Sequence, residues 1–150
     1  MGRLRCLLGL GIALAAAGCQ VKAPTSNAVQ YPSYIRFPEN EVATGVSVFR
    51  NSMNKGGMVE VARVSRTCLG TTAPGVERGL VRQCFAFETA AFQVATAHDA
   101  RMGSAPLANL SRRDFDRRLD GYCAAMGITP PDCPAARTSM TEQVASRLSR

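Results

Sequence analysis

Apolar residues recur at steps of three and four along most of this chain, the spacing that places side chains on one face of an α-helix. The first such stretch covers residues 39–54 and stops at the turn signal Asn54-Lys55-Gly56-Gly57. The second stretch, 58–69, is short and fits either a helix or a strand. Val46 and Val48 in the first stretch also favour a strand, so both alternatives stay open over residues 42–69. The repeating positions are Val42, Val46, Phe49 and Met53 in the first stretch, and Met58, Val61, Ser65 and Cys68 in the second.

Three more helices are predicted from the same spacing. The longest opens at 72–74, becomes regular near Gly79 and ends at Gly103. Its apolar surface is wide enough to predict a central helix that packs on more than one side. The next helix follows residue 110, and the last covers 135–148. The repeating positions are Val76, Leu80, Cys84, Phe87, Ala91, Val94 and His98, then Phe115, Leu119, Tyr122, Cys123 and Met126, then Met140, Val144 and Leu148.

The helix after residue 110 has the clearest end signals. Ser111 fits an N-cap with Asp114 three positions later, and Leu110 and Phe115 are spaced as a hydrophobic staple. Asp114 and Arg118 have the spacing of an ion pair on the solvated face. Gly127 fits the left-handed position that ends many helices. The whole pattern predicts a mainly α domain of four or five helices over residues 39–150, behind an irregular N-terminal tether.

The start of the chain has the layout of a secretory signal. Arg3 and Arg5 precede the uncharged run Cys6–Ala17, which is rich in Leu and Ala. This run has only about a dozen residues, whereas a membrane-spanning helix needs roughly 20. Small residues follow it, as they do before a signal-peptide cleavage site. We therefore expect residues 1–18 to be a cleaved signal peptide.

The residues Leu14-Ala15-Ala16-Ala17-Gly18-Cys19 resemble the lipobox of bacterial lipoprotein precursors, although Ala16 stands where that family prefers Leu. The resemblance implies a diacylglyceryl group on Cys19, cleavage after Gly18 and acylation of the new amino group. Two or three acyl chains make a stable anchor, at about 0.8 kcal/mol per buried methylene. Because Gln20 is not the aspartate that retains such proteins at the inner membrane of enteric bacteria, the resemblance favours the outer membrane, facing the periplasm. The inner membrane and the cell surface are the alternatives.

Signal cleavage changes the charge and the cysteine count. Without Arg3 and Arg5 the chain has 16 basic and 11 acidic residues, a net charge of +5. A basic surface suits anionic lipid or an acidic partner. Nucleic acid is not expected after export, and no helix carries a clean basic stripe. Four cysteines remain besides the lipid-bearing Cys19, which predicts two disulfides. Of the three connectivities we prefer the nearest-neighbour one, Cys68–Cys84 with Cys123–Cys133.

Residues 19–38 form the predicted lipid-anchored tether, because Pro24, Pro32 and Pro38 interrupt regular structure. As a flexible coil it spans about 24 Å. It carries three aromatic residues within seven positions. They either fold back onto the domain core or form a docking segment for a protein partner. These residues are Tyr31, Tyr34 and Phe37.

Candidate chemistry in the predicted domain is sparse. The single histidine, His98, precedes Asp99, but adjacent helical residues point about 100° apart and do not form a ready dyad. Glu88 lies in an apolar run where a carboxyl group could act as a general acid. The helical pattern instead places it on the outward side. The cysteine spacings match no zinc or haem motif, and no phosphate-binding glycine pattern occurs, so we expect no metal or cofactor.

These patterns favour a non-enzymatic envelope lipoprotein, an accessory or assembly factor that binds a protein partner near the outer membrane. The second hypothesis is a periplasmic module that binds a small molecule or lipid in a pocket between helices. The third is a cell-wall-active enzyme that uses Glu88. The residues that would line the pocket are Phe85, Phe87, Phe92 and Met102.

Overall fold

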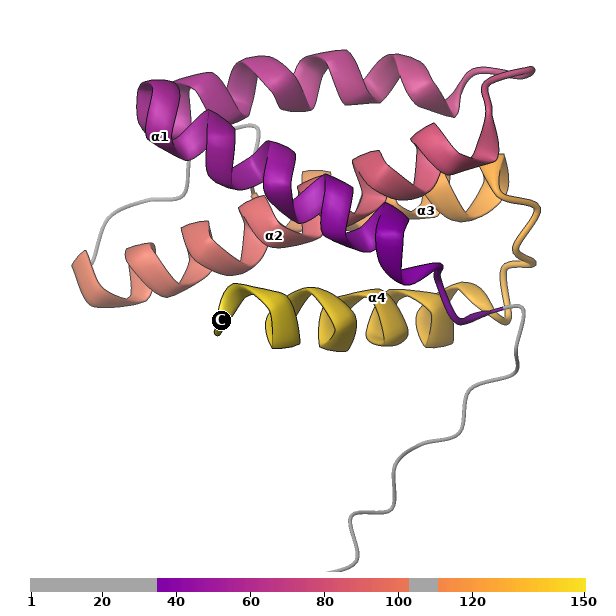
Figure 1. Ribbon diagram of the computed structural model, residues 1–150. Coiled ribbons are helices and arrows are strands. Elements are labelled where there is room, and N and C mark those ends of the chain that lie inside the picture. Colours follow the sequence, from indigo (N-terminus) through magenta and orange to yellow (C-terminus); the bar gives the residue numbers. More distant parts are fainter. Residues whose placement is uncertain (1–34, 103–110) are drawn as a thin grey trace, which may run out of the picture.

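The computed structural model describes residues 35–102 and 111–150, and within them the fold is helical without strands. The mainly α prediction is therefore confirmed. The predictions for residues 1–34 and for Leu110 lie outside the described residues. The elements are α1 (Glu39–Leu69), the short 3₁₀ helix η2 (Gly70–Thr72), α2 (Arg78–Met102), α3 (Arg112–Ala125) and α4 (Cys133–Leu148) (Figure 1).

A sharp bend divides α1 into two segments. Gly56 (φ −160°, ψ 20°) and Gly57 (φ 59°, ψ −150°) have non-helical backbone angles. Figure 1 shows the consequence: the chain runs in one direction before the bend and returns after it. The predicted stop at residues 54–57 is thus where the chain turns back, and residues 58–69 are helix rather than strand. Counting α1 as one helix or two gives the predicted four or five.

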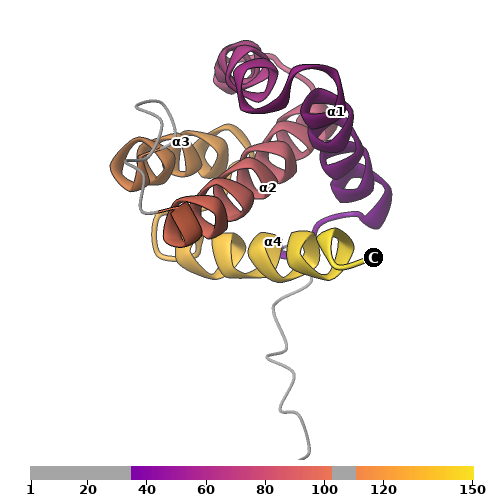
Figure 2. The ribbon, with the colours of Figure 1, turned by 90° about the vertical axis from the view of Figure 1, so that its left-hand side faces the viewer.

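Helix α2 is the centre of the domain, as its wide apolar surface predicted. It packs against α1, α3 and α4 (Figure 2). Every residue from Cys84 to Ala91 is buried, so this stretch faces protein on all sides. Aromatic rings from three other parts of the chain meet it: Phe37 before α1 packs edge-on against Phe85, Tyr122 of α3 stacks on the same ring, and Phe49 of α1 packs against Phe87.

Helices α1 and α2 approach closely at Gly45. A methyl group built on Gly45 would lie 2.3 Å from the backbone oxygen of Gln83 and 2.7 Å from the Cβ of Ala86. Glycine is therefore required here by space, because any larger side chain would push the two helices apart. The first turn of α1 is tied to α2 as well, since the Glu41 carboxylate accepts from the Arg82 guanidinium at 2.5 and 3.1 Å.

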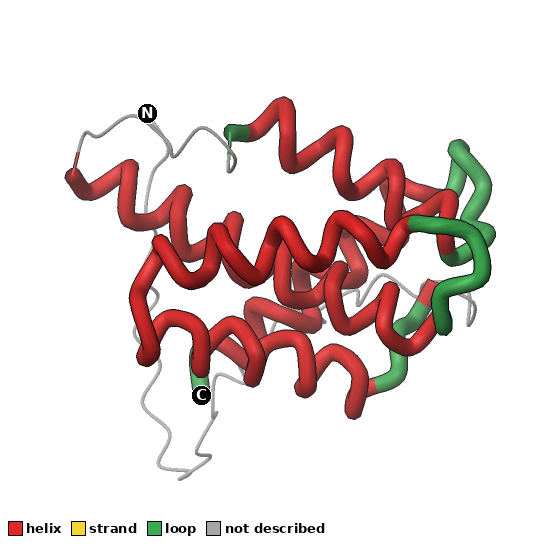
Figure 3. The backbone as a smooth tube through the Cα atoms, turned by 90° about the horizontal axis from the view of Figure 1, so that it is seen from above, coloured by secondary structure: helices red, strands yellow, loops and turns green. Residues whose placement is uncertain are grey.

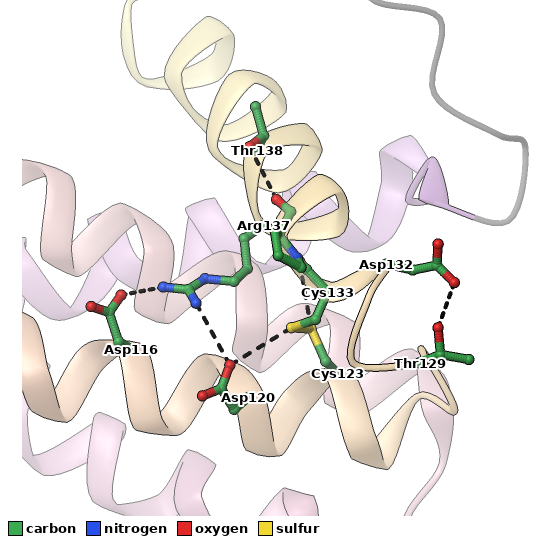
Figure 4. Close-up of a disulfide and its surroundings, with 9 residues drawn as sticks. Asp116, Asp120, Cys123, Thr129, Asp132, Cys133, Arg137 and Thr138 are labelled. Atoms are coloured by element: carbon green, nitrogen blue, oxygen red, sulfur yellow. Dashed lines mark hydrogen bonds and ion pairs between the residues drawn. A yellow bond between two sulfur atoms is a disulfide. The ribbon is translucent and has the colours of Figure 1, made fainter.

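Two disulfides join neighbouring elements with the pairing that we preferred. Cys68 at the end of α1 is bonded to Cys84 of α2, and Cys123 of α3 to Cys133, the first residue of α4. Figure 4 shows the second bridge. There Arg137 of α4 also reaches across to Asp116 and Asp120 of α3. The α3–α4 hairpin is therefore held covalently at its turn and by ion pairs along its length.

The helix ends follow the predicted signals with two corrections. The Ser111 hydroxyl caps α3 by accepting the backbone N–H of Asp114 at 3.3 Å, and Gly127 has φ 74° after the helix. The predicted Asp114–Arg118 ion pair is wrong: Asp114 contacts Arg117 at 3.3 Å, and Arg118 turns inward. Helix α4 begins at Cys133 rather than at 135, because a proline in the first turn of a helix breaks no hydrogen bond.

Three connecting segments meet at one end of the domain. They are residues 35–38 before α1, residues 70–77 between α1 and α2, and residues 126–132 between α3 and α4 (Figures 1 and 3). The described chain thus enters the domain beside the turn of the α3–α4 hairpin. This end carries one of the two candidate sites described next.

Candidate functional sites

A buried polar cluster lies between α1, α2 and α3. Glu88 of α2 is 0% exposed. The Ser65 hydroxyl of α1 donates to one Glu88 oxygen at 2.5 Å, and the Arg118 guanidinium of α3 lies 3.2 Å from the other. Tyr122, one turn after Arg118, is also fully buried, and its hydroxyl has no hydrogen-bond partner among the described residues. We call these four residues the Glu88 cluster.

Opposing effects act on the pKa of Glu88 in the Glu88 cluster. Burial raises the pKa of Glu88, while the nearby Arg118 charge and the Ser65 hydrogen bond lower it. The net direction is upward because removal from water disfavours the carboxylate. Burial, with the Glu88 charge, also raises the pKa of the Tyr122 phenol well above its ordinary value. The cluster thus concentrates one carboxylate, one guanidinium and two hydroxyls in a region that excludes water.

The outward orientation predicted for Glu88 is wrong. The side chain points into the domain because α2 is covered on all sides at this level, so even its polar position is enclosed. A general acid must contact the group that it protonates. With no exposed surface, Glu88 has no such access in this conformation. Its partner Arg118 is not predicted by the sequence pattern, which places this residue in the solvated run 112–120. The one available signal was that this run has more arginines than its aspartates can pair.

His98 lies at the opposite extreme, on the surface. Its side chain is 62% exposed, and Nδ1 lies 3.6 Å from Asp99 Oδ1. This separation is too long for a hydrogen bond. The expected absence of a ready dyad therefore fits the geometry of these two side chains. The apolar face of α2 ends before His98, at the buried Ala95.

A second candidate site is a cleft at the end of the domain where the three connecting segments meet. Its volume is about 520 Å³, within the range of small-molecule sites. We call it the arginine cleft, because each of Arg36, Arg78 and Arg82 lines it. The full lining is Arg36, Phe37, Arg78, Arg82, Met126, Gly127, Ile128, Thr129 and Asp132.

The arginines of this cleft differ in their partners. Arg82 is half-buried and held by Glu41, so its position is fixed. Arg36 and Arg78 are exposed, and neither forms an ion pair with a described residue. Asp132 accepts from the Thr129 hydroxyl at 2.6 Å (Figure 4). The floor is apolar, since Phe37 and Met126 are 3% and 8% exposed. The lining therefore combines buried apolar side chains with two exposed arginines that form no ion pair within the described part of the chain.

The residues proposed to line a lipid pocket do not converge on one cavity. Phe85 and Phe87 are buried in the core and pack against other rings, so they fill space rather than enclose it. Phe92 stacks on Phe115 at 4.0 Å, at the edge of a separate groove of about 390 Å³ between α2, α3 and α4. The side chain of Met102 lies outside the described residues. The predicted pocket of these four residues is therefore not formed as a unit.

Only one of the three proposed docking aromatics is described. Phe37 is 3% exposed and packs edge-on against Phe85 at 5.5 Å. Its ring therefore belongs to the core, which is the fold-back alternative of the sequence analysis, and it is not offered to a partner in this conformation. Tyr31 and Tyr34 lie outside the described residues, as does the lipidation candidate Cys19.

Comparison with known proteins does not point to a function for either site. No protein-family profile, curated protein or solved structure matches this chain. In the described segments, no helix is long and apolar enough to cross a membrane. Among residues 35–102 and 111–150, no group of three or more His, Cys, Asp or Glu side chains is arranged to hold a metal ion.

Proposed function

We propose that this protein is a lipid-anchored envelope protein without catalytic activity, whose helical domain binds a protein partner near the outer membrane. The observation that carries the proposal is the lipobox-like start, Leu14–Cys19, followed by a small domain with two disulfides. Disulfides persist in oxidising compartments such as the periplasm. The export signal and the disulfide-bonded domain thus agree with each other.

The packing of Phe37 supports a defined geometry for this anchored domain. The tether ends in the core at Ile35 and Phe37, which are 1% and 3% exposed. The last tether residues are therefore fixed, and a partner contacted through Tyr31 or Tyr34 would meet the domain at the end that carries the arginine cleft. The sealed position of Glu88 counts against the cell-wall enzyme, because that hypothesis needed an accessible general acid.

The anchor is tested by metabolic labelling with palmitate. We expect the wild-type protein to incorporate label, and the Cys19→Ala variant to incorporate none and to keep its signal peptide. An unlabelled wild-type protein, or a labelled Cys19→Ala variant, would refute the anchor.

Partner binding is tested by crosslinking in intact envelopes and identification of the captured protein. The double variant Tyr31→Ser/Tyr34→Ser should lose the crosslink while the domain stays folded. Phe37 is kept, because its removal would damage the core and confuse the result. His98→Ser, an exposed change far along α2, is the matched control. A partner set unchanged by the tyrosine substitutions would remove the tether's role.

The alternative function is ligand binding, and one observation favours it. The arginine cleft has the volume, the apolar floor and the unpaired charge of a site for an amphipathic anion. This second candidate does not exclude a protein partner, because the cleft and the tether residues 31 and 34 are separate determinants. The ligand that the cleft suits is considered next.

A further inference from the structure

We propose that the arginine cleft binds a phosphate-bearing ligand, and that in the envelope this ligand is the headgroup of an anionic phospholipid. The phosphate chemistry rests on the cleft alone. The assignment to a membrane lipid rests on the proposed function, because it requires the anchor on Cys19.

The first argument is the supply of hydrogen-bond donors. A guanidinium has five N–H donors in a fixed planar fork, which matches the oxygens of phosphate. Arg82 uses two nitrogens on Glu41 and keeps further N–H groups. Arg36 and Arg78 have all their donors uncommitted to other described side chains. Three guanidiniums therefore line one cleft, and among residues 35–102 and 111–150 only that of Arg82 forms an ion pair.

The second argument is that Arg36 and Arg78 form no ion pair with another described residue, so their charges are available to a ligand. Seven of the fourteen arginines in the described segments form ion pairs, as Arg63 does with Glu60 and Arg137 with Asp116, and Arg36 and Arg78 belong to the other seven. Exposed arginines on neighbouring segments without a carboxylate partner among the described residues are available to attract an anion. Asp132 lines the same cleft and accepts from the Thr129 hydroxyl, so its negative charge offsets one of the two arginines that lack an ion pair, and one positive charge remains in excess. An external anion would relieve this excess of positive charge.

The third argument is the apolar floor together with the position of the cleft. Phe37, Met126 and Ile128 line the cleft together with the arginines, and this apolar part suits the glycerol and first methylenes of a lipid better than an inorganic ion. Arg36 lies at the start of the described chain, on the tether side of the domain. A lipid on Cys19 would hold this end, rather than the far end of α2, toward the bilayer surface. Basic residues close to a membrane surface are attracted to anionic lipid headgroups.

The test uses the mature chain from Gln20, made without Cys19 so that no acyl chain contributes to binding. All described core residues lie between 35 and 148, so this chain contains the whole folded domain. Binding is measured by co-sedimentation with vesicles of phosphatidylglycerol and, separately, of phosphatidylcholine. The cleft variant is Arg36→Gln/Arg78→Gln. The control variant is Arg66→Gln/Arg113→Gln. It removes the same charge from exposed arginines that lie outside the cleft and form no ion pair with a described residue.

We expect binding to phosphatidylglycerol that the cleft substitutions weaken about tenfold and the control substitutions less than about threefold. Competition by glycerol 1-phosphate or inorganic phosphate distinguishes a soluble phosphate ligand from a lipid headgroup. Displacement of the protein from vesicles by either soluble phosphate supports the phosphate chemistry. Selective loss of vesicle binding in the cleft variant without such displacement supports the lipid headgroup. Equal losses in the two variants would overturn the proposal, as would wild-type protein that binds neither vesicles nor soluble phosphate. Failure here leaves the anchor and partner tests unaffected, because they are made in cells and do not use the cleft.

Discussion

The Glu88–Arg118 pair gives the sharpest prediction about this fold. At 3.2 Å and an effective dielectric constant of about 20, two unit charges attract by roughly 5 kcal/mol. Burial of each ion costs several kcal/mol, so the net worth of the pair is small. Removal of one partner is different, because the other charge stays buried without compensation. We therefore expect Arg118→Met to destabilise the domain by about 3–5 kcal/mol at neutral pH.

The double variant Glu88→Gln/Arg118→Met separates this explanation from simple loss of packing. It removes both charges, keeps the side-chain volumes similar and leaves the glutamine amide near the Ser65 hydroxyl. We expect it to recover most of the stability that Arg118→Met loses, with a cost below about 2 kcal/mol relative to wild type. The measurement is urea unfolding followed by circular dichroism with the disulfides intact.

The same pair predicts a pH dependence of defined sign. The pKa of Glu88 is raised in the folded state above its ordinary value of 4.5. Between these two values the folded protein binds a proton that the unfolded chain has released, so stability falls as the pH rises through this window. Arg118→Met should widen the window, because the Arg118 charge lowers the pKa of Glu88. Glu88→Gln should abolish this component.

Two results would refute the reasoning. One is an Arg118→Met variant that loses less than about 1 kcal/mol at neutral pH, since a buried carboxylate cannot lose its only cationic partner so cheaply. The other is a double variant as unstable as the single one, which would show that packing around Arg118, and not charge burial, determines the loss.

The remaining predictions concern backbone and covalent constraints. Gly45→Ala should destabilise the domain by at least about 1–3 kcal/mol in urea unfolding, because its methyl group meets α2 at 2.3 Å. Gly57→Ala should cost about 1–3 kcal/mol at its positive φ. Gly70→Ala, with φ −67° and open space, is the control for both and should change stability by less than about 0.5 kcal/mol. Cys123→Ser/Cys133→Ser should lower stability by about 3 kcal/mol, and an unchanged midpoint would show that the hairpin ion pairs suffice.

Much of the architecture was determined by local chemistry that the sequence displays. The steps of three and four among apolar residues define helices in any helical protein. Ser111 and Gly127 mark the ends of α3 through capping and left-handed backbone geometry, which depend on a few neighbours only. The cysteine pairing also follows from short loops, because nearest neighbours in the chain are already close in space.

Other features were decided only by tertiary packing. The helical period cannot tell whether the outer side of a central helix meets solvent or a third helix, so Glu88 was expected outside and lies at the core. Arg118 pairs with the buried Glu88 and not with Asp114, because a carboxylate without a cation costs more free energy in the core than at the surface. The arginine cleft brings residues 36, 78 and 132 together through three chain segments that no spacing relates. The sequence by itself thus determined most of the helices and their ends and predicted two disulfides with a preferred pairing, while the fold decided which cysteines pair, which charges are buried together and which arginines line one cleft.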